Sequence, residues 1–189
     1  MKTLLGDITL PFQVLIWGLP GQGKSTFSLK LASELSKFAG VLIVAGEEDI
    51  ESNTFSKRIG STIEKENLKH IKAVSRLPNG AEWLSALDRS IDQKEMRFVV
   101  YDSINVLGLI PNHAKSLNEN PILALKTKGL GHIYISQAQK DGKAYMGNAA
   151  WGHEVDVIIK VVEGKAIIEK NRFATDEFGK AGSQFSIFG

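Results

Sequence analysis

Residues 18 to 26 read Gly-Leu-Pro-Gly-Gln-Gly-Lys-Ser-Thr, and this stretch decides the fold. It follows directly on the apolar run Gln13–Trp17 (QVLIW), which predicts a buried strand, and a helical pattern begins at Lys24. Glycines in such a loop let the backbone approach phosphate oxygens closely, and the N–H groups at the start of the helix supply positive potential. The stretch therefore predicts a phosphate-binding loop between a strand and a helix.

Each position of this loop has an expected role. The residues that we expect to contact a nucleotide are Gly18, Leu19, Pro20, Gly21, Gln22, Gly23, Lys24, Ser25 and Thr26. The Lys24 ammonium would reach the β- and γ-phosphates, the Ser25 hydroxyl would bind Mg²⁺, and Thr26 would lie beside the α-phosphate. The alternative is a glycine turn that only caps a helix, and the strand before the loop and the helix after it make that alternative rare.

Apolar runs and helical patterns alternate along the rest of the chain. Further strands are predicted at residues 41–45, 70–74, 98–101, 133–136, 157–162 and 165–169, and helices at 24–38 and 78–91. Strands separated by helices predict an α/β fold with a mostly parallel central sheet and helices on both faces. The last two strands, joined by the short turn Glu163-Gly164, form an antiparallel C-terminal pair. Without a repeat or linker, the 189 residues are expected to form a single domain over 1–189.

Two strand ends carry the acids that a nucleotide site needs. The run Phe98–Asp102 (FVVYD) ends in an aspartate, which would hold magnesium through water. Glu47 comes just after the strand predicted at 41–45, and the C-terminal ends of parallel strands meet beside the ligand. A carboxylate there can orient and deprotonate an attacking water, although acids also favour the first turn of a solvated helix. We prefer the solvated alternative for Glu48 and Asp49, which follow it.

Composition excludes several classes of protein. The chain has no cysteine, which excludes disulfides and thiolate metal sites. No apolar run approaches the roughly 20 residues of a membrane helix, and no secretory signal pattern is present. The expectation is a cytoplasmic protein that does not bind a membrane. A net charge of +2 is too small to indicate nucleic-acid binding by itself.

These features together resemble the RecA/DnaB/KaiC superfamily of P-loop ATPases, and in particular the ATPase core of bacterial RadA (Sms). The RadA-like segments are Gly46-Glu47-Glu48, His153-Glu154-Val155-Asp156 and Lys170-Asn171-Arg172-Phe173. The resemblance covers essentially the whole chain, and Lys-Asn-Arg-Phe is its most specific part. It implies a RecA-like core that uses ATP and Mg²⁺.

The resemblance also implies roles for individual residues. Glu47 would be the catalytic base, and Gln137 would sense the γ-phosphate. Lys170 and Arg172 would project into the nucleotide site of a neighbouring subunit, which implies self-assembly into a hexameric ring or a helical filament. Alternation along a strand places these two side chains on one face, and an exposed polar strand end is the alternative. Arg58 is a candidate for stacking on the base.

The sequence departs from the RadA pattern in three ways, and a likeness to DnaB helicases at one strand end leaves the exact subfamily open. The lack of cysteine gives no support for RadA's zinc-binding module, and its protease-like domain is not expected either. Ala174 follows Phe173 where RadA has glycine, and the ending Ser136-Gln137 looks more like DnaB helicases. A core-only relative is therefore expected.

In this superfamily two loops hold single-stranded DNA, and here they correspond to residues 105–116 and 138–151. The second loop carries Lys140, Lys143 and Tyr145, which could pair with phosphates and stack on a base. The alternative is a mobile surface loop with ordinary lysines. The leading hypothesis is thus a DNA-stimulated ATPase of recombination, repair or replication.

Three other functions stay open. A KaiC-like regulatory ATPase with protein partners would share every feature of the nucleotide site. A small P-loop metabolite kinase would need an arginine-rich lid, whereas the five arginines here are not clustered. A binding module without hydrolysis is disfavoured because Lys24, Ser25, Asp102 and Glu47 are all present.

Overall fold

The computed structural model describes residues 1–75, 83–91, 96–107, 125–146, 150–175 and 179–188. The strands are β1 (Lys2–Thr3), β2 (Gly6–Asp7), β3 (Phe12–Gly18), β4 (Gly40–Ala45), β5 (Ile71–Ser75), β6 (Met96–Asp102), β7 (Gly131–Gln137), β8 (Val157–Val162), β9 (Lys165–Asn171) and β10 (Gln184–Ser186). The helices are α1 (Lys24–Leu35), α2 (Asn53–Thr62), a 3₁₀ helix η1 (Lys65–His70), α3 (Trp83–Ser90), α4 (Ile104–Leu107) and α6 (Ala150–Glu154). None of these helices is long and apolar enough to cross a bilayer.

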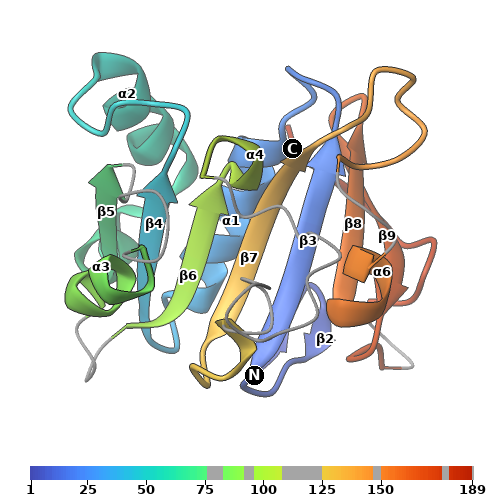
Figure 1. The fold of residues 1–189 in the computed structure, drawn as a ribbon, viewed down its shortest axis with the longest axis horizontal. Helices are drawn as coiled ribbons and strands as arrows, with labels where there is room; N and C mark the ends of the chain where they lie inside the picture. The colour runs from blue at the N-terminus through green and yellow to red at the C-terminus, as the bar shows by residue number, and fades with distance from the viewer. Residues whose placement is uncertain (76–82, 92–95, 108–124, 147–149, 176–178, 189) are drawn as a thin grey trace.

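One large sheet organises the molecule, with the strand order β10-β9-β8-β3-β7-β6-β4-β5. Strands β8, β3, β7, β6, β4 and β5 pair in parallel, while β9 and β10 are antiparallel to their neighbours. The predicted fold class is confirmed, including the C-terminal strand pair. Since β3 lies between β7 and β8, the phosphate loop that follows it has strand ends on both sides (Figure 1).

Apolar side chains cover both faces of the sheet. On one face, Leu31 and Leu35 of α1 pack against Val14 and Ile16 of β3, and Phe55 of α2 joins them. On the other face, Leu87 of α3 packs with a second cluster that contains alternate residues of the same strands. Figure 1 shows α1 behind the sheet and α3 in front of it. Strands buried on both sides explain the continuous apolar runs in the sequence.

The first helix is shorter than the sequence predicts. The expected helix over 24–38 ends at Leu35, where the Ser36 N–H still bonds to the Ala32 carbonyl as a cap. Phe38 therefore leaves the buried face and is 50% exposed. Helix α2, the β1–β2 hairpin and β10 were not predicted, because their short or polar sequences lack a strong apolar period.

A stack of polar aromatic rings lies inside the second cluster. Tyr101 of β6 and His132 and Tyr134 of β7 are fully buried, with ring centroids 5.2 to 6.1 Å apart. The Tyr101 hydroxyl is 3.0 Å from His132 Nδ1. Burial lowers the pKa of His132 from 6.5 to about 4, although a backbone hydrogen bond at Leu125 acts in the other direction. The imidazole is thus neutral in the folded protein at neutral pH.

We expect this histidine to make the fold sensitive to acid. Below pH 6.5 the unfolded chain binds a proton that folded His132 does not take until about pH 4. The stability that neutral His132 contributes is complete above pH 6.5 and is lost as the pH falls towards 4. The free energy of unfolding should therefore drop by about 2 kcal/mol between pH 7 and pH 5. Denaturant unfolding at both pH values measures the drop. His132→Asn should remove most of it, whereas the exposed control His70→Asn should keep it. An unchanged drop in His132→Asn would assign the effect to other groups.

Candidate active site

The phosphate loop joins the end of β3 to the start of α1. Gly23, at the N-terminal cap of α1, has φ 100°, a backbone conformation that glycine adopts without strain. The Lys24 ammonium turns back to donate to the Leu19 carbonyl at 2.9 Å. Burial lowers the pKa of Lys24, and the nearby carboxylates of Glu47 and Asp102 oppose this shift. The loop thus holds its cation above the ends of the central strands.

A cavity of about 330 Å³ opens over this loop. Its lining includes most of the residues that the sequence predicts for the site: Pro20, Gly21, Gly23, Lys24, Ser25, Thr26, Glu47, Asp102 and Gln137. Arg58, Ile135 and Phe188 complete the lining. Cavities of this size accommodate small-molecule ligands and cofactors.

The two predicted acids meet because their strands are neighbours. Asp102 ends β6 and pairs in register with Ala45, the last residue of β4, so Glu47 follows directly beside it. The backbone carbonyl of Asp102 also accepts hydrogen bonds from the Gly46 and Glu47 N–H groups. Burial raises the pKa of the Asp102 carboxyl, while a hydrogen bond from the Ser25 side chain and the charge of Arg58 act to lower it.

Glu47 is held by two side-chain donors. Its Oε1 accepts from the Ser103 hydroxyl and, at 3.2 Å, from Gln137 Nε2 at the end of β7. The backbone N–H of Gln137 in turn donates to Asn105 Oδ1 at 2.9 Å. Sequence reasoning missed Ser103 and placed Asn105 only at the start of the first predicted DNA loop. Their position just after a strand that ends in aspartate is the one available signal for a role at this site. The turn that begins at Asp102 therefore reaches both Glu47 and Gln137.

Ser25 and Asp102 fit a magnesium ion of the kind that shares its ligands with phosphates. Within the described ranges, no group of three or more His, Cys, Asp or Glu residues could hold a metal by itself. Mg²⁺ commonly uses one or two protein ligands, with phosphate oxygens and water for the rest. The hydrogen bond between the Ser25 hydroxyl and the largely buried Asp102 carboxylate brings two suitable oxygen ligands together.

Arg58 of α2 lies on the same side of the cavity as these acids. It forms an ion pair with Glu48, lies 4.0 Å from Asp102 Oδ2, and stacks over the Phe55 ring at 5.8 Å. Glu48, which we expected to be solvated, is thus paired instead. These contacts place Arg58 beside the predicted metal ligand, and its proposed stacking on a base remains a prediction.

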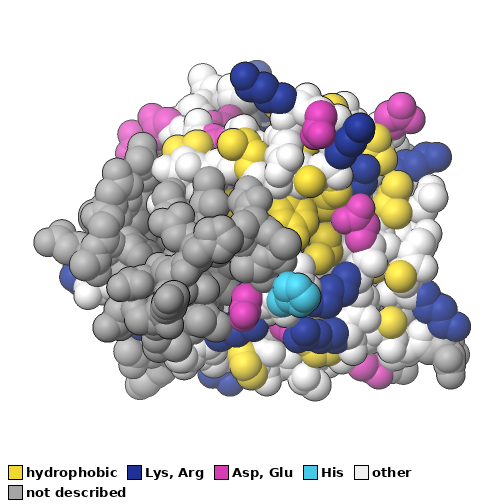
Figure 2. Space-filling view, turned by 45° about the vertical axis from the view of Figure 1, so that its right-hand side comes forward, with side chains coloured by type: hydrophobic (Ala, Val, Ile, Leu, Met, Phe, Trp, Pro, Cys, Tyr) yellow, Lys and Arg dark blue, Asp and Glu magenta, His cyan; other side chains and the backbone are white. Residues whose placement is uncertain are grey.

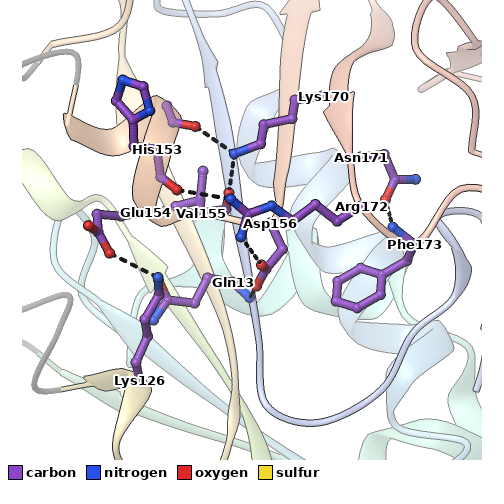
Figure 3. Close-up of polar contacts among 11 residues, drawn as sticks. Gln13, Lys126, His153, Glu154, Val155, Asp156, Lys170, Asn171, Arg172 and Phe173 are labelled. Carbon is purple, nitrogen blue, oxygen red and sulfur yellow. Dashed lines mark hydrogen bonds and ion pairs between the residues drawn. The ribbon is translucent and has the colours of Figure 1, made fainter.

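Lys170 and Arg172 both reach the segment that precedes β8 (Figure 3). Lys170 Nζ donates to the carbonyls of Gly152 and Val155, the latter at 2.7 Å. Arg172 forms an ion pair with Asp156 at 3.0 Å and donates to the His153 carbonyl. Neither side chain is among those that line the cavity of its own chain.

Asn171 of Lys-Asn-Arg-Phe reaches the turn of the N-terminal hairpin. Asn171 donates to the carbonyls of Leu5 and Gly179 at 2.7 and 2.8 Å, and its Oδ1 accepts from the Phe173 N–H. Lys170 and Asn171 therefore contact different segments of the chain, as expected for adjacent side chains that alternate along β9.

The second predicted DNA loop is described at residues 138–146 and again from 150. Lys140 and Lys143 are exposed there. Tyr145 instead packs edge-on against Trp17, with ring centroids 5.9 Å apart, and its hydroxyl lies against the backbone of Gly152. Most of the first predicted loop, residues 108–116, lies outside the described residues. In Figure 2, basic, acidic and hydrophobic side chains are interspersed on the visible described surface.

Comparison with known proteins agrees with this geometry. No protein-family model matches the chain. The DNA repair protein RadA of Haemophilus influenzae is 28% identical over 198 residues, and RadA of Bacillus subtilis is 29% identical over 196. These matches include 96% and 94% of this chain but 41% and 40% of the two RadA proteins. The chain therefore spans about 40% of the length of the curated relatives it matches.

Solved structures share the fold at lower identity. A KaiC-like protein from Pyrococcus horikoshii superposes with a TM-score of 0.67 at 19% identity, covering 95% of this chain and 86% of its own. The RadB recombinase gives 0.62 at 15% identity, with 97% and 94% covered. The ATPase domain of G40P gives 0.57 at 16% identity, with 87% and 78% covered. The sequence similarity to RadA is weak but consistent, and the fold is that of the RecA-like P-loop ATPases.

Proposed function

We propose that this chain, which is similar to RadA and has the fold of the RecA-like ATPases, hydrolyses ATP with Mg²⁺ as an assembly on single-stranded DNA. Its role would lie in recombination, repair or replication. One observation carries the hydrolytic part of the proposal. The Glu47 carboxylate, fixed by Ser103 and Gln137, lines the same cavity as Lys24, Ser25 and Asp102.

The proposed chemistry follows from these positions. Lys24 and the N–H groups of the loop would bind the β- and γ-phosphates, exchanging the Leu19 carbonyl for phosphate oxygens. Glu47 would accept a proton from the attacking water, and Gln137 would link the γ-phosphate to the residues that follow β7. Magnesium, when bound at Ser25 and Asp102, supplies neutralisation of the charge that develops on the phosphates.

The placement of Lys170 and Arg172 supports an assembly. Both are cations in a motif shared with RadA, yet neither lines the cavity of its own chain. We propose that they complete the site of a neighbouring subunit, where they would stabilise the charge of the transition state. A ring or a helical filament would provide that neighbour.

Lys140 and Lys143 support the DNA part of the proposal, and their removal tests it. Two exposed lysines per subunit would give an assembly roughly 6–10 phosphate contacts, enough for affinity to fall about 10³- to 10⁵-fold between 50 and 200 mM salt. Single-stranded DNA should therefore stimulate hydrolysis at low salt. The double variant Lys140→Ala/Lys143→Ala should lose the stimulation and the salt dependence, while its DNA-free rate should stay unchanged. Steady-state hydrolysis and DNA binding over a salt series measure both.

A matched pair of lysines provides the control. Lys65 and Lys69 of η1 are also exposed, and Lys65→Ala/Lys69→Ala should keep full stimulation. If DNA does not change the rate of ATP hydrolysis by the unaltered protein, a regulatory ATPase with protein partners would instead be favoured. The packing of Tyr145 against Trp17 favours this second candidate, because it occupies an aromatic ring that could otherwise stack on a base. Transfer of phosphate to a small metabolite instead of water would indicate a kinase.

A further inference from the structure

The two ends of the cavity have different chemistry, and the strand order separates them. The carboxylates of Asp102 and Glu47 follow β6 and β4, which lie beyond β7 on one side of β3. The turn between β8 and β9 lies on the other side. If the γ-phosphate lies at the carboxylates and the α-phosphate at Thr26, the nucleoside must extend towards β8 and β9. Arg58, which pairs with Glu48, lies at the carboxylate end, so this direction argues against the predicted stacking of Arg58 on the base.

Phe188 occupies the end where the nucleoside would emerge. It lines the cavity and is nevertheless 65% exposed, the most exposed large apolar side chain among the described residues. Figure 1 places this C-terminal end of the chain at the top of β3 and β7. An apolar ring left in water at the edge of a polar cavity is a feature of ligand sites.

The surrounding residues fix the ring beside the phosphate loop. Ile187 is buried in the core at 1% exposure, and its N–H donates to the Gly164 carbonyl at 2.8 Å. The Phe188 ring lies against both Gly23 and Gly164, since a Cβ on either glycine would come within 3.0 Å of it. In addition, Gln22 of the phosphate loop accepts a hydrogen bond from the Glu163 N–H in the same turn. The ring is thus positioned by the loop, the turn and the core.

We propose that Phe188 is the platform on which the base of the bound nucleotide stacks. The proposal rests on the proposed nucleotide binding, but not on hydrolysis or on DNA. Stacking on a phenyl ring uses the π-face that every base has, so Phe188 would strengthen the binding of ATP and GTP by a similar factor. Selection between bases would need polar groups that the ring does not supply.

Binding of ATP and of inorganic tripolyphosphate, each with Mg²⁺, tests the platform. Removal of an aromatic ring on which a base stacks weakens binding by about 5- to 140-fold. We therefore expect Phe188→Ala to weaken ATP binding by that factor and to leave tripolyphosphate binding unchanged. Equal ATP affinity in the variant would overturn the proposal, and so would an equal loss for both ligands, which would indicate a structural role.

Further variants separate stacking from other effects. Phe38→Ala removes another half-exposed ring, at the far end of α1, and should change neither affinity. Phe188→Trp should retain ATP binding, and its fluorescence should change with ATP but not with tripolyphosphate; the same emission change with both would contradict stacking. An unaltered protein that binds ATP no more tightly than tripolyphosphate would refute the platform and leave the phosphate site intact. ATP binding without hydrolysis would refute the proposed hydrolysis and leave the result for Phe188 unaffected.

Discussion

Glu47→Gln should lower kcat for ATP hydrolysis by about 10²- to 10⁴-fold, the range that a positioned general base contributes. Glutamine keeps the size of the side chain and an oxygen for the Ser103 hydroxyl, but it cannot accept a proton from water. The nucleotide should consequently still bind. Steady-state hydrolysis gives kcat, and equilibrium binding of ATP gives the affinity.

The control for this substitution is another glutamate of the same segment. Glu51 is exposed and lies beyond the cavity lining, so Glu51→Gln should keep both the rate and the affinity. A Glu47→Gln protein that retains more than about a tenth of the rate would remove Glu47 from the role of base. A loss of ATP affinity with kcat unchanged would show instead that the carboxylate supports binding of the ground state.

The second large effect is expected at Arg172. A finger supplied by a neighbouring subunit contributes about 10³- to 10⁵-fold to kcat, so Arg172→Ala should be at least as inactive as the variant at Glu47. The same substitution also removes the ion pair between Arg172 and Asp156, and that loss needs its own control. Asp156→Asn breaks that pair, keeps an oxygen for the Gln13 N–H and retains Arg172, so it should remain active.

Mixing two inactive proteins tests whether Arg172 acts in trans. In a random 1:1 assembly of Glu47→Gln and Arg172→Ala, about one interface in four would combine an intact Glu47 with an intact Arg172. The mixture should then recover about a quarter of the unaltered rate, if the sites are independent. A finger acting within its own chain would give no recovery, because every subunit would carry one defect.

Local chemistry explains what could be predicted from the sequence. The phosphate loop is read from consecutive residues, and the ends of parallel strands bring Asp102, Glu47 and Gln137 to one edge of the sheet, as expected. These residues line the cavity because a strand's position in the sheet also fixes where its last side chain lies. The sequence also predicted that Lys170 and Asn171 point to opposite faces, because successive side chains of a strand alternate.

What could not be predicted depends on pairing between distant segments. Serine after an acidic strand end is too common to identify Ser103 as the donor to Glu47, and only the folded geometry shows the contact. Phe188 lies after a three-residue strand with no apolar period, yet the pairing of β10 with β9 carries it to Gly23. The end of α1 before Phe38 was also missed, since an apolar residue at helical spacing does not ensure that the helix continues.

The turn from Asp102 to Asn105 connects several parts of the site through very few bonds. Asp102 is a proposed metal ligand, and the Ser103 hydroxyl donates a hydrogen bond to Glu47. Asn105, in the first turn of α4, accepts a hydrogen bond from the backbone N–H of Gln137. A partner that displaces α4 would alter all three together and so change the affinity for ATP. Linkage then requires that ATP change the affinity for that partner by the same factor. The short turn would thus give nucleotide and partner a shared coupling free energy, measurable from either side.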